Sequence, residues 1–232
     1  MKQLVIGYGE IGQAVYKCLK DNKQQVYKRD KQKVNKRNVE VLHICFPYDK
    51  RFKKQVKKYI DEYKPFLVMV YSTVPIGTCD DIGVGIVHSP VEGKHPKLAE
   101  SIKKSPRWIG GDVLATLNMA ISIWVGITTV RIVESTKATE FLKLRSTAKY
   151  GINIVWAAYE GGIAKDIDLA FDVVKEFDKD YNELYKQLGM PEYQRYILDP
   201  PTSSIGGHCI VPNAKLLNEQ YPSEMLDMII DL

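Results

Sequence analysis

The feature that most constrains this chain is a glycine pattern close to its N-terminus. Residues 3–6 form a short run typical of a buried parallel strand, and G-x-G-x-x-G follows at once, with glycines at Gly7, Gly9 and Gly12. The first glycine permits a tight turn, the second lets the backbone approach a pyrophosphate, and the third lets a helix pack closely on the strand. The pattern predicts a strand, a turn and a helix whose N-terminus faces the phosphates of a dinucleotide.

A carboxylate about twenty residues downstream strengthens this prediction. A second apolar segment at residues 25–27 leads to Asp30, whose side chain would accept hydrogen bonds from the ribose on the adenine side. Such a carboxylate would repel a 2'-phosphate and therefore favours NAD over NADP. Lys28 and Arg29 weaken that preference, because an arginine at this place can pair with the phosphate. A strand, turn and helix without any ligand is the alternative interpretation.

Composition excludes several other classes of protein. The 232 residues suffice for one large domain, or for a standard domain with an appended helical one. The hydrophobic fraction of 45% and the charged fraction of 26% are typical of a soluble globular protein. No segment reaches the roughly 18 apolar residues that span a bilayer, and the glycine turn begins too early for a signal peptide. We expect a cytoplasmic protein that does not contact a membrane.

The cysteines and the net charge indicate neither a metal site nor a nucleic-acid partner. The four cysteines lie far apart without a C-x-x-C pair, so neither a zinc site nor a disulfide framework is predicted. The net charge is +5, but the basic residues are spread along the chain. The densest cluster, at residues 28–37, is predicted to form a solvated loop, and no nucleic-acid binding is expected.

The first half of the chain alternates between strand and helix patterns. Helices are predicted at residues 50–63 and 112–124, and strands at 39–46, 66–71, 85–88, 107–109 and 128–133. This alternation predicts an α/β fold, a Rossmann doubly wound parallel sheet, over residues 1–134. Ligands of such sheets bind beyond the carboxyl ends of the strands. The predicted cofactor-binding residues are therefore Gly7, Gly9, Glu10, Ile11, Gly12, Asp30, Pro47, Ser72 and Thr73.

The second half, residues 135–232, is predicted to be a helical domain. A helix with Thr136 as its N-cap is predicted to run to about residue 160, where Gly161 and Gly162 interrupt it. Further helices are predicted at 166–187, ending at Gly189 ahead of Pro191, and at 213–220 after Pro212. The chain ends in an apolar tail at residues 228–232 that could bury against a partner.

Seven short motifs occur in order along the chain. They are IGYGEIG (6–12), FP (46–47), STVPIGT (72–78), HSPVEG (88–93), PRWIGG (106–111), ESTKATEFLKL (134–144) and IGGHCIVPNAKLL (205–217). Together they resemble the motifs of the UDP-glucose/GDP-mannose dehydrogenase family, which includes UDP-N-acetylmannosamine dehydrogenases. The resemblance covers nearly the whole chain. The family also has a C-terminal nucleotide-binding domain, and we expect this chain to lack it because the sequence ends soon after the cysteine motif.

The resemblance implies an enzyme of polysaccharide biosynthesis that forms a homodimer through its long helix and helical region. Its reaction is the oxidation of a nucleotide-sugar alcohol by two successive hydride transfers to NAD, giving a uronic acid. In that chemistry Cys209 attacks the intermediate aldehyde, and oxidation of the thiohemiacetal gives a thioester that water hydrolyses. Lys143 corresponds to the lysine that stabilises developing negative charge, and Thr73 to the threonine beside the nicotinamide. Without the resemblance, Cys209 would be interpreted as a buried structural cysteine, Lys143 as a solvated lysine and Thr73 as a strand-end cap.

The sequence departs from the family pattern at three positions. Thr147 replaces an asparagine, Asn213 replaces an aspartate that assists as a base, and Val91 replaces a glutamate, with Glu92 one position later. An amide cannot accept a proton at neutral pH, so hydrolysis of the thioester is in doubt. Two hypotheses follow: an NAD-dependent enzyme, or a catalytically degenerate NAD-binding protein that partners a full-length dehydrogenase. Oxidation that stops at the aldehyde, or at a trapped thioester, is intermediate between them.

Overall fold

The computed structural model describes residues 1–30, 38–93, 96–206 and 209–232. Most of the predicted basic loop therefore lies outside the described residues. The chain divides into two compact units, Met1–Leu144 and Arg145–Leu232.

The first unit is built on a seven-stranded sheet in its described residues, with the order β2-β1-β3-β4-β5-β6-β7. The strands are β1 (Gln3–Ile6), β2 (Val26–Arg29), β3 (Val41–Ile44), β4 (Leu67–Val70), β5 (Ile86–His88), β6 (Arg107–Gly110) and β7 (Val130–Val133). Strands β1 to β5 pair in parallel, and the strand order reverses its direction at β1. A ligand crevice in a doubly wound sheet forms at such a point of reversal.

The prediction of a parallel sheet is wrong at one edge. Strand β6 pairs antiparallel with β5 through His88 and Gly110, and β7 runs parallel to β6. The sequence gives no signal for this direction, because a short apolar run buries its side chains equally well in either orientation.

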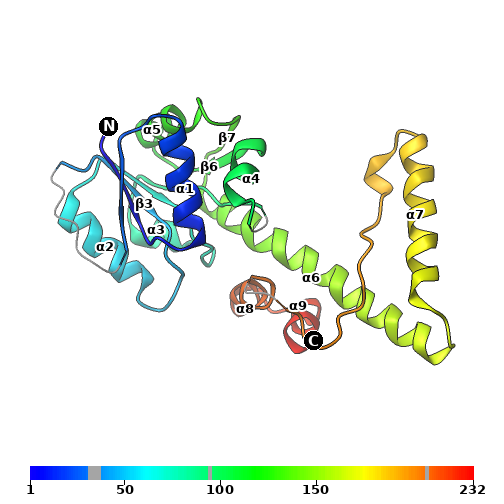
Figure 1. Cartoon of the computed structure of the whole chain (residues 1–232). Helices are drawn as coiled ribbons and strands as arrows, with labels where there is room; N and C mark the ends of the chain where they lie inside the picture. The colour runs from blue at the N-terminus through cyan, green and yellow to red at the C-terminus, as the bar shows by residue number, and fades with distance from the viewer. Residues whose placement is uncertain (31–37, 94–95, 207–208) are drawn as a thin grey trace. The chain divides into compact units, whose positions relative to one another are not determined.

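Helices cover both faces of the sheet (Figure 1). Helices α1 (Glu10–Asp21), α4 (Leu98–Lys104) and α5 (Leu114–Trp124) contribute to one apolar core, and α2 (Phe52–Tyr63) and α3 (Thr78–Ile82) contribute to the other. The fold is therefore the predicted Rossmann type. Helices α3 and α4 were not predicted, because elements this short show no helical periodicity.

Helix α6 (Thr136–Asp166) begins in the first unit and continues into the second. The predicted N-cap is wrong by one residue, because it is the Ser135 hydroxyl that accepts a hydrogen bond from the Ala138 N–H at 3.3 Å. The predicted interruption at Gly161 and Gly162 is also wrong. A Cβ on Gly161 would lie 2.6 Å from the Pro200 Cγ, so close packing within the second unit requires this glycine.

The rest of the second unit contains further helices, as predicted from the sequence, but the helix predicted at 166–187 begins only at Phe171, and a helix over the apolar tail was not predicted. It contains α7 (Phe171–Gln187), the 3-10 turn η1 (Pro191–Tyr193), α8 (Ile210–Gln220) and α9 (Glu224–Asp231). Gly189 has a φ of +69°, which confirms the predicted stop after α7. Helix α8 starts earlier than predicted, because Pro212 fits in a first turn, where its missing N–H is not needed. Within the described ranges, no helix has the length and apolar character that crossing a membrane requires.

The two adjacent glycines of α6 provide a matched test of this packing. We expect Gly162→Ala to raise the free energy of unfolding by about 0.5–1 kcal/mol, because it adds helix propensity at a position with open space around it. Gly161→Ala should lower that free energy by about 1–3 kcal/mol, because the methyl group collides with Pro200. Urea unfolding followed by circular dichroism measures both changes. Equal stabilisation by the two variants would contradict the packing described.

Candidate functional site

The turn after β1 combines two crowded glycines with an open one. Gly7 has a φ of +88°, and a Cβ there would lie 2.7 Å from the Phe46 nitrogen. A Cβ on Gly12 would overlap the Gly7 carbonyl oxygen. Around a Cβ on Gly9, by contrast, no described atom lies within 4 Å. Gly9 is the N-cap of α1, so main-chain N–H groups at this helix start border open space where an anion can approach.

Asp30 lies at the end of β2, beside this turn. Its Oδ1 accepts a hydrogen bond from the Tyr8 N–H at 3.4 Å, and its side chain is exposed. The neighbouring Arg29 points to α2, where its guanidinium donates to Glu62 at 2.9 Å and to the Tyr63 hydroxyl at 2.6 Å. These contacts hold Arg29 away from the role of a phosphate ligand that the sequence left open.

The ends of β3 and β4 are tied together by Ser72. Its buried hydroxyl donates to the Phe46 carbonyl at 2.6 Å, next to the exposed Pro47. Thr73 follows Ser72 and is half-buried. The structure therefore places the predicted residues of these two loops at the carboxyl ends of neighbouring strands. The Ser72 hydroxyl itself donates its hydrogen bond to the main chain of the protein.

The loop after β4 is also fixed by Glu140 of α6, a residue that the sequence reasoning did not assign to the site. Its buried carboxylate accepts hydrogen bonds from the Gly77 N–H at 2.6 Å and the Cys79 N–H at 2.8 Å, at the start of α3. Burial raises the pKa of Glu140, and the two N–H donors oppose that rise. The sequence shows only an acidic residue near the start of a predicted helix, and this does not by itself indicate the contact with the loop.

His88 at the end of β5 is buried between two polar partners. Its Nε2 lies 3.2 Å from the Ser72 carbonyl oxygen, and its Nδ1 lies 2.9 Å from the Thr139 hydroxyl. Because a carbonyl only accepts, Nε2 carries the proton and Nδ1 accepts from Thr139. Burial lowers the pKa of His88 to about 4, so the imidazole is neutral at physiological pH.

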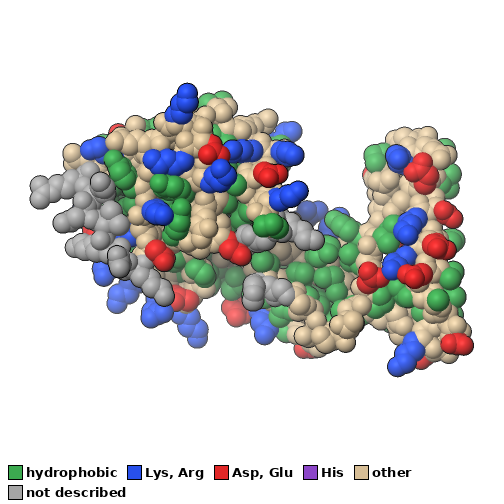
Figure 2. Space-filling view, in the orientation of Figure 1, with side chains coloured by type: hydrophobic (Ala, Val, Ile, Leu, Met, Phe, Trp, Pro, Cys, Tyr) green, Lys and Arg blue, Asp and Glu red, His purple; other side chains and the backbone are tan. Residues whose placement is uncertain are grey.

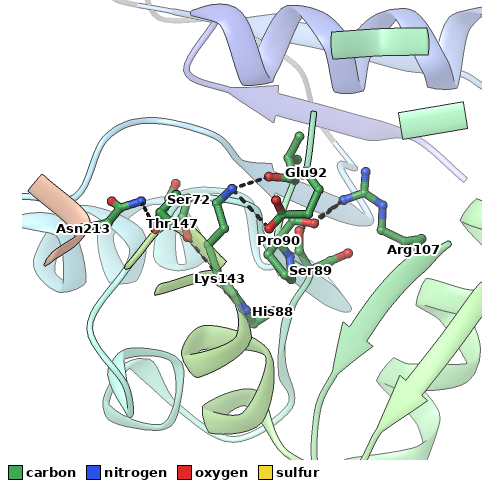
Figure 3. A network of polar contacts seen from close by, with 10 residues as sticks. Ser72, His88, Ser89, Pro90, Glu92, Arg107, Lys143, Thr147 and Asn213 are labelled. Carbon is green, nitrogen blue, oxygen red and sulfur yellow. Dashed lines mark hydrogen bonds and ion pairs between the residues drawn. The ribbon is translucent and has the colours of Figure 1, made fainter. Parts of the chain in front are cut away.

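Lys143 of α6 binds the segment that follows His88 (Figure 3). Its Nζ donates to the Val91 carbonyl at 2.7 Å and lies 3.3 Å from the Glu92 Oε1. The Lys143 side chain is only 14% exposed. The Glu92 carboxylate, one position later in the sequence than the glutamate of the family pattern, therefore lies beside the Lys143 ammonium.

Arg107 binds the same segment and was also missed. It is buried at the start of β6, and its Nη1 donates to the Pro90 carbonyl at 2.9 Å and, more weakly, to the Ser89 carbonyl at 3.4 Å. The guanidinium lies 4.5 Å from the centroid of a Trp124 ring. A lone arginine in a predicted buried strand is the sequence signal that could have identified it, because buried cations need polar partners.

In the second unit, the two neutral replacements contact each other. The buried Asn213 of α8 donates from its Nδ2 to the Thr147 hydroxyl of α6 at 3.0 Å (Figure 3). Cys209 is exposed and is the N-cap of α8, one turn before Asn213. Thr147 and Asn213 thus form a hydrogen-bonded pair without an acidic group. Among the residues that the structure describes, no three His, Cys, Asp or Glu side chains gather into a metal site.

Solved structures of dehydrogenases are similar to this chain over its whole length. UDP-D-ManNAc dehydrogenase from Pyrococcus horikoshii has a TM-score of 0.84 at 16% identity, with 100% of this chain and 68% of that chain covered. A UDP-glucose dehydrogenase from Pyrobaculum islandicum has a TM-score of 0.78 at 13% identity, covering 100% and 67%. The chain shares their fold. The 3-hydroxyisobutyrate dehydrogenase of Mycobacterium tuberculosis is also similar, with a TM-score of 0.73 at 13% identity, covering 100% and 92%. No protein-family model and no curated protein matches the chain.

The buried His88 makes stability depend on pH. In the unfolded chain a histidine binds a proton below its ordinary pKa of 6.5, whereas folded His88 does so only near pH 4. The free energy of unfolding should therefore fall as the pH is lowered from 6.5 to 4, by at most about 1.4 kcal/mol per pH unit from this group. His43, whose pKa burial lowers to about 3, adds a fall of the same sign.

Denaturant unfolding at a series of pH values measures this dependence. The variant His88→Gln keeps a donor and an acceptor but cannot titrate, so its stability should fall less steeply with decreasing pH than that of the parent chain. An identical slope in both proteins would show that His88 is not the buried neutral group described.

Proposed function

We propose that this protein is an NAD-dependent oxidoreductase that acts on the alcohol of a nucleotide sugar. The observation that carries the proposal is the open Gly9 at the start of α1, with Asp30 beside the same turn. This arrangement fits a dinucleotide, because main-chain N–H groups can meet the pyrophosphate while a carboxylate accepts from the ribose. The shared fold of nucleotide-sugar dehydrogenases supports the choice of substrate class.

The surroundings of Asp30 support NAD rather than NADP. A 2'-phosphate needs a basic partner. Of the two basic residues before Asp30, Arg29 is held by Glu62 and Tyr63, and Lys28 lies over the Tyr8 ring with its Nζ 4.1 Å from the ring centroid. The exposed carboxylate of Asp30 would also repel a second negative charge. When bound, NAD accepts the hydride that leaves the alcohol carbon.

The protein's own residues would perform the remaining chemistry. Lys143 stabilises negative charge that develops on the substrate oxygen, and Cys209 supplies the sulfur that attacks the aldehyde carbon. Thr73 lies beside the nicotinamide in this proposal. The pair of Asn213 and Thr147 supplies hydrogen-bond donors and acceptors but no base, so a thioester on Cys209 would be hydrolysed slowly.

A catalytically degenerate NAD-binding protein is the second candidate. The neutral Thr147–Asn213 pair favours it, because neither side chain can accept a proton as a base at neutral pH. Such a protein would bind NAD without turnover and would act as the partner subunit of a full-length dehydrogenase.

Release of NADH distinguishes these candidates. The purified protein is mixed with NAD and a panel of UDP- and GDP-sugars, and absorbance of NADH is recorded. We expect a burst of about two NADH per site, because both oxidations precede hydrolysis of the thioester, which stalls without a base. Cys209→Ala should abolish covalent trapping of the sugar, and Asn213→Asp should convert the burst into continuous turnover.

The control for cofactor binding is Gly9→Ala, which adds a methyl group to open space and should leave folding unchanged while weakening NAD binding. If NAD binds and no sugar yields NADH, the enzyme proposal fails for these sugars and the partner-subunit candidate stands. If NAD does not bind at all, both candidates fail.

We further propose that the protein is a homodimer formed through its second unit. None of the residues of α7 is buried, although the helix carries large apolar side chains between charged ones (Figure 2). Phe177 of α7 is 66% exposed, and Trp156 and Tyr159 of α6 are 58% and 61% exposed. A cavity of about 530 Å³ within this unit is lined by Trp156, Phe171 and Arg195, among others. Large aromatic side chains that are more than half exposed, such as these three, are typical of surfaces through which proteins associate.

The molar mass in solution tests the homodimer. Light scattering should give twice the chain mass of 26.4 kDa for the parent protein, and Phe177→Glu should shift it toward the monomer. The matched control is Phe66→Glu in the first unit, where Phe66 is 72% exposed. A monomeric parent protein, or equal effects of the two variants, would contradict the proposal.

A further inference from the structure

Arg107 is a buried cation whose surroundings are specific to arginine. The residue is 3% exposed, and its guanidinium lies 4.5 Å from a Trp124 ring centroid and 5.7 Å from that of Tyr71. A planar guanidinium can stack on aromatic faces and still donate from its edge, which a lysine ammonium cannot do in the same geometry. Burying this charge is costly unless hydrogen bonds satisfy its donors. Two main-chain carbonyls accept from the Arg107 Nη1, whereas its Nε has no hydrogen-bond partner among the described residues.

Those hydrogen bonds fix one short piece of main chain. Arg107 donates to the carbonyls of Pro90 and Ser89, at 2.9 Å and 3.4 Å. The Ser89 hydroxyl donates in the reverse direction, to the Trp108 carbonyl at 2.8 Å. Residues 89 and 90 are therefore tied to the start of β6 by side chains from both sides.

The next two residues are the ones that hold Lys143. Val91 offers its carbonyl oxygen at 2.7 Å from the Lys143 Nζ, and the Glu92 carboxylate lies at 3.3 Å. On the other side of the segment, His88 is fixed between Ser72 and Thr139. Figure 3 shows Arg107 and Lys143 reaching the segment from different elements.

We infer that Arg107 is a positioning residue, which fixes residues 89–91 so that the Val91 carbonyl holds the Lys143 ammonium in one place. Arg107 acts through Lys143 and does not itself touch substrate. Its consequence for catalysis rests on the proposed function, because it matters only if Lys143 stabilises charge on a reacting oxygen. The link from Arg107 to Lys143 does not depend on any activity.

Chemical labelling of lysines tests the link without substrate or cofactor. The protein is treated briefly with acetic anhydride, and the modification of each lysine is measured by mass spectrometry. In Arg107→Lys, acetylation of Lys143 should rise about 3- to 10-fold, the size expected when one buried hydrogen bond is lost. Exposed Lys57 and Lys58 of α2 serve as internal references and should not change.

Arg131→Lys is the matched control. Arg131 lies on β7 opposite Trp108, its guanidinium 5.9 Å from the Trp108 ring centroid, and it is exposed. This variant should leave the labelling of Lys143 unchanged. Unchanged labelling in Arg107→Lys, or an equal rise in Arg131→Lys, would overturn the inference. If Arg107→Lys does not fold, Ser89→Ala carries the test, because it removes the other tie on the same segment and should also raise labelling of Lys143.

Kinetics test the catalytic consequence separately. If NADH is formed, Arg107→Lys should slow the burst of NADH roughly 10- to 100-fold and leave its dependence on the NAD concentration unchanged. In a Lys143→Met background, Arg107→Lys should cause no further loss, since the two residues act in sequence. Additive losses would mean that Arg107 acts independently of Lys143. Absence of NADH in the parent protein would defeat the proposed function, while the labelling result would still decide the inference about Arg107.

Discussion

Helix α1 approaches β1 so closely that Gly12 has no room for a side chain. A Cβ there would overlap the Gly7 carbonyl oxygen, and Gly7 is itself pressed against the main chain of Phe46. This contact fixes the direction of α1 and aims its N-terminus at the space beside Gly9. Strand β2 pairs in parallel with β1, so Asp30, which follows β2, lies with its carboxylate beside the helix start. The proposed dinucleotide site depends on both arrangements.

The loops at the other carboxyl ends are held by the first turns of α6. Thr139, Glu140 and Lys143 bind His88, the start of α3 and the Val91 carbonyl in turn. Three polar side chains on one helix thus anchor two loops at the carboxyl ends of the strands. Fixed loops of this kind hold catalytic groups with little reorganisation. Arg107, at the start of β6, also fixes the second of these loops by donating a hydrogen bond to the Pro90 carbonyl.

The neutral pair of Thr147 and Asn213 distinguishes this chain chemically from the family that its motifs resemble. The Asn213 amide donates to the Thr147 hydroxyl, so the two departures lie in contact in the fold. A hydrogen-bonded amide and hydroxyl preserve packing and polarity but remove the group that would accept a proton from water. Binding and oxidation would then be separable from hydrolysis, which is why both an arrested enzyme and a binding subunit are consistent with the same fold.

The sequence by itself determined the strand, turn and helix at the N-terminus, the alternating elements of the first unit and the stop at Gly189, because these depend on local backbone requirements and on periodicity. It also placed Asp30, Pro47 and Ser72 at strand ends. Only the tertiary structure decided the direction of β6, the formation of α3, the continuity of α6 and the role of Arg107. Each depends on a partner distant in sequence: His88 pairs with Gly110, Glu140 caps α3, Pro200 packs on Gly161, and Trp124 covers the guanidinium. No local pattern encodes a contact of that kind.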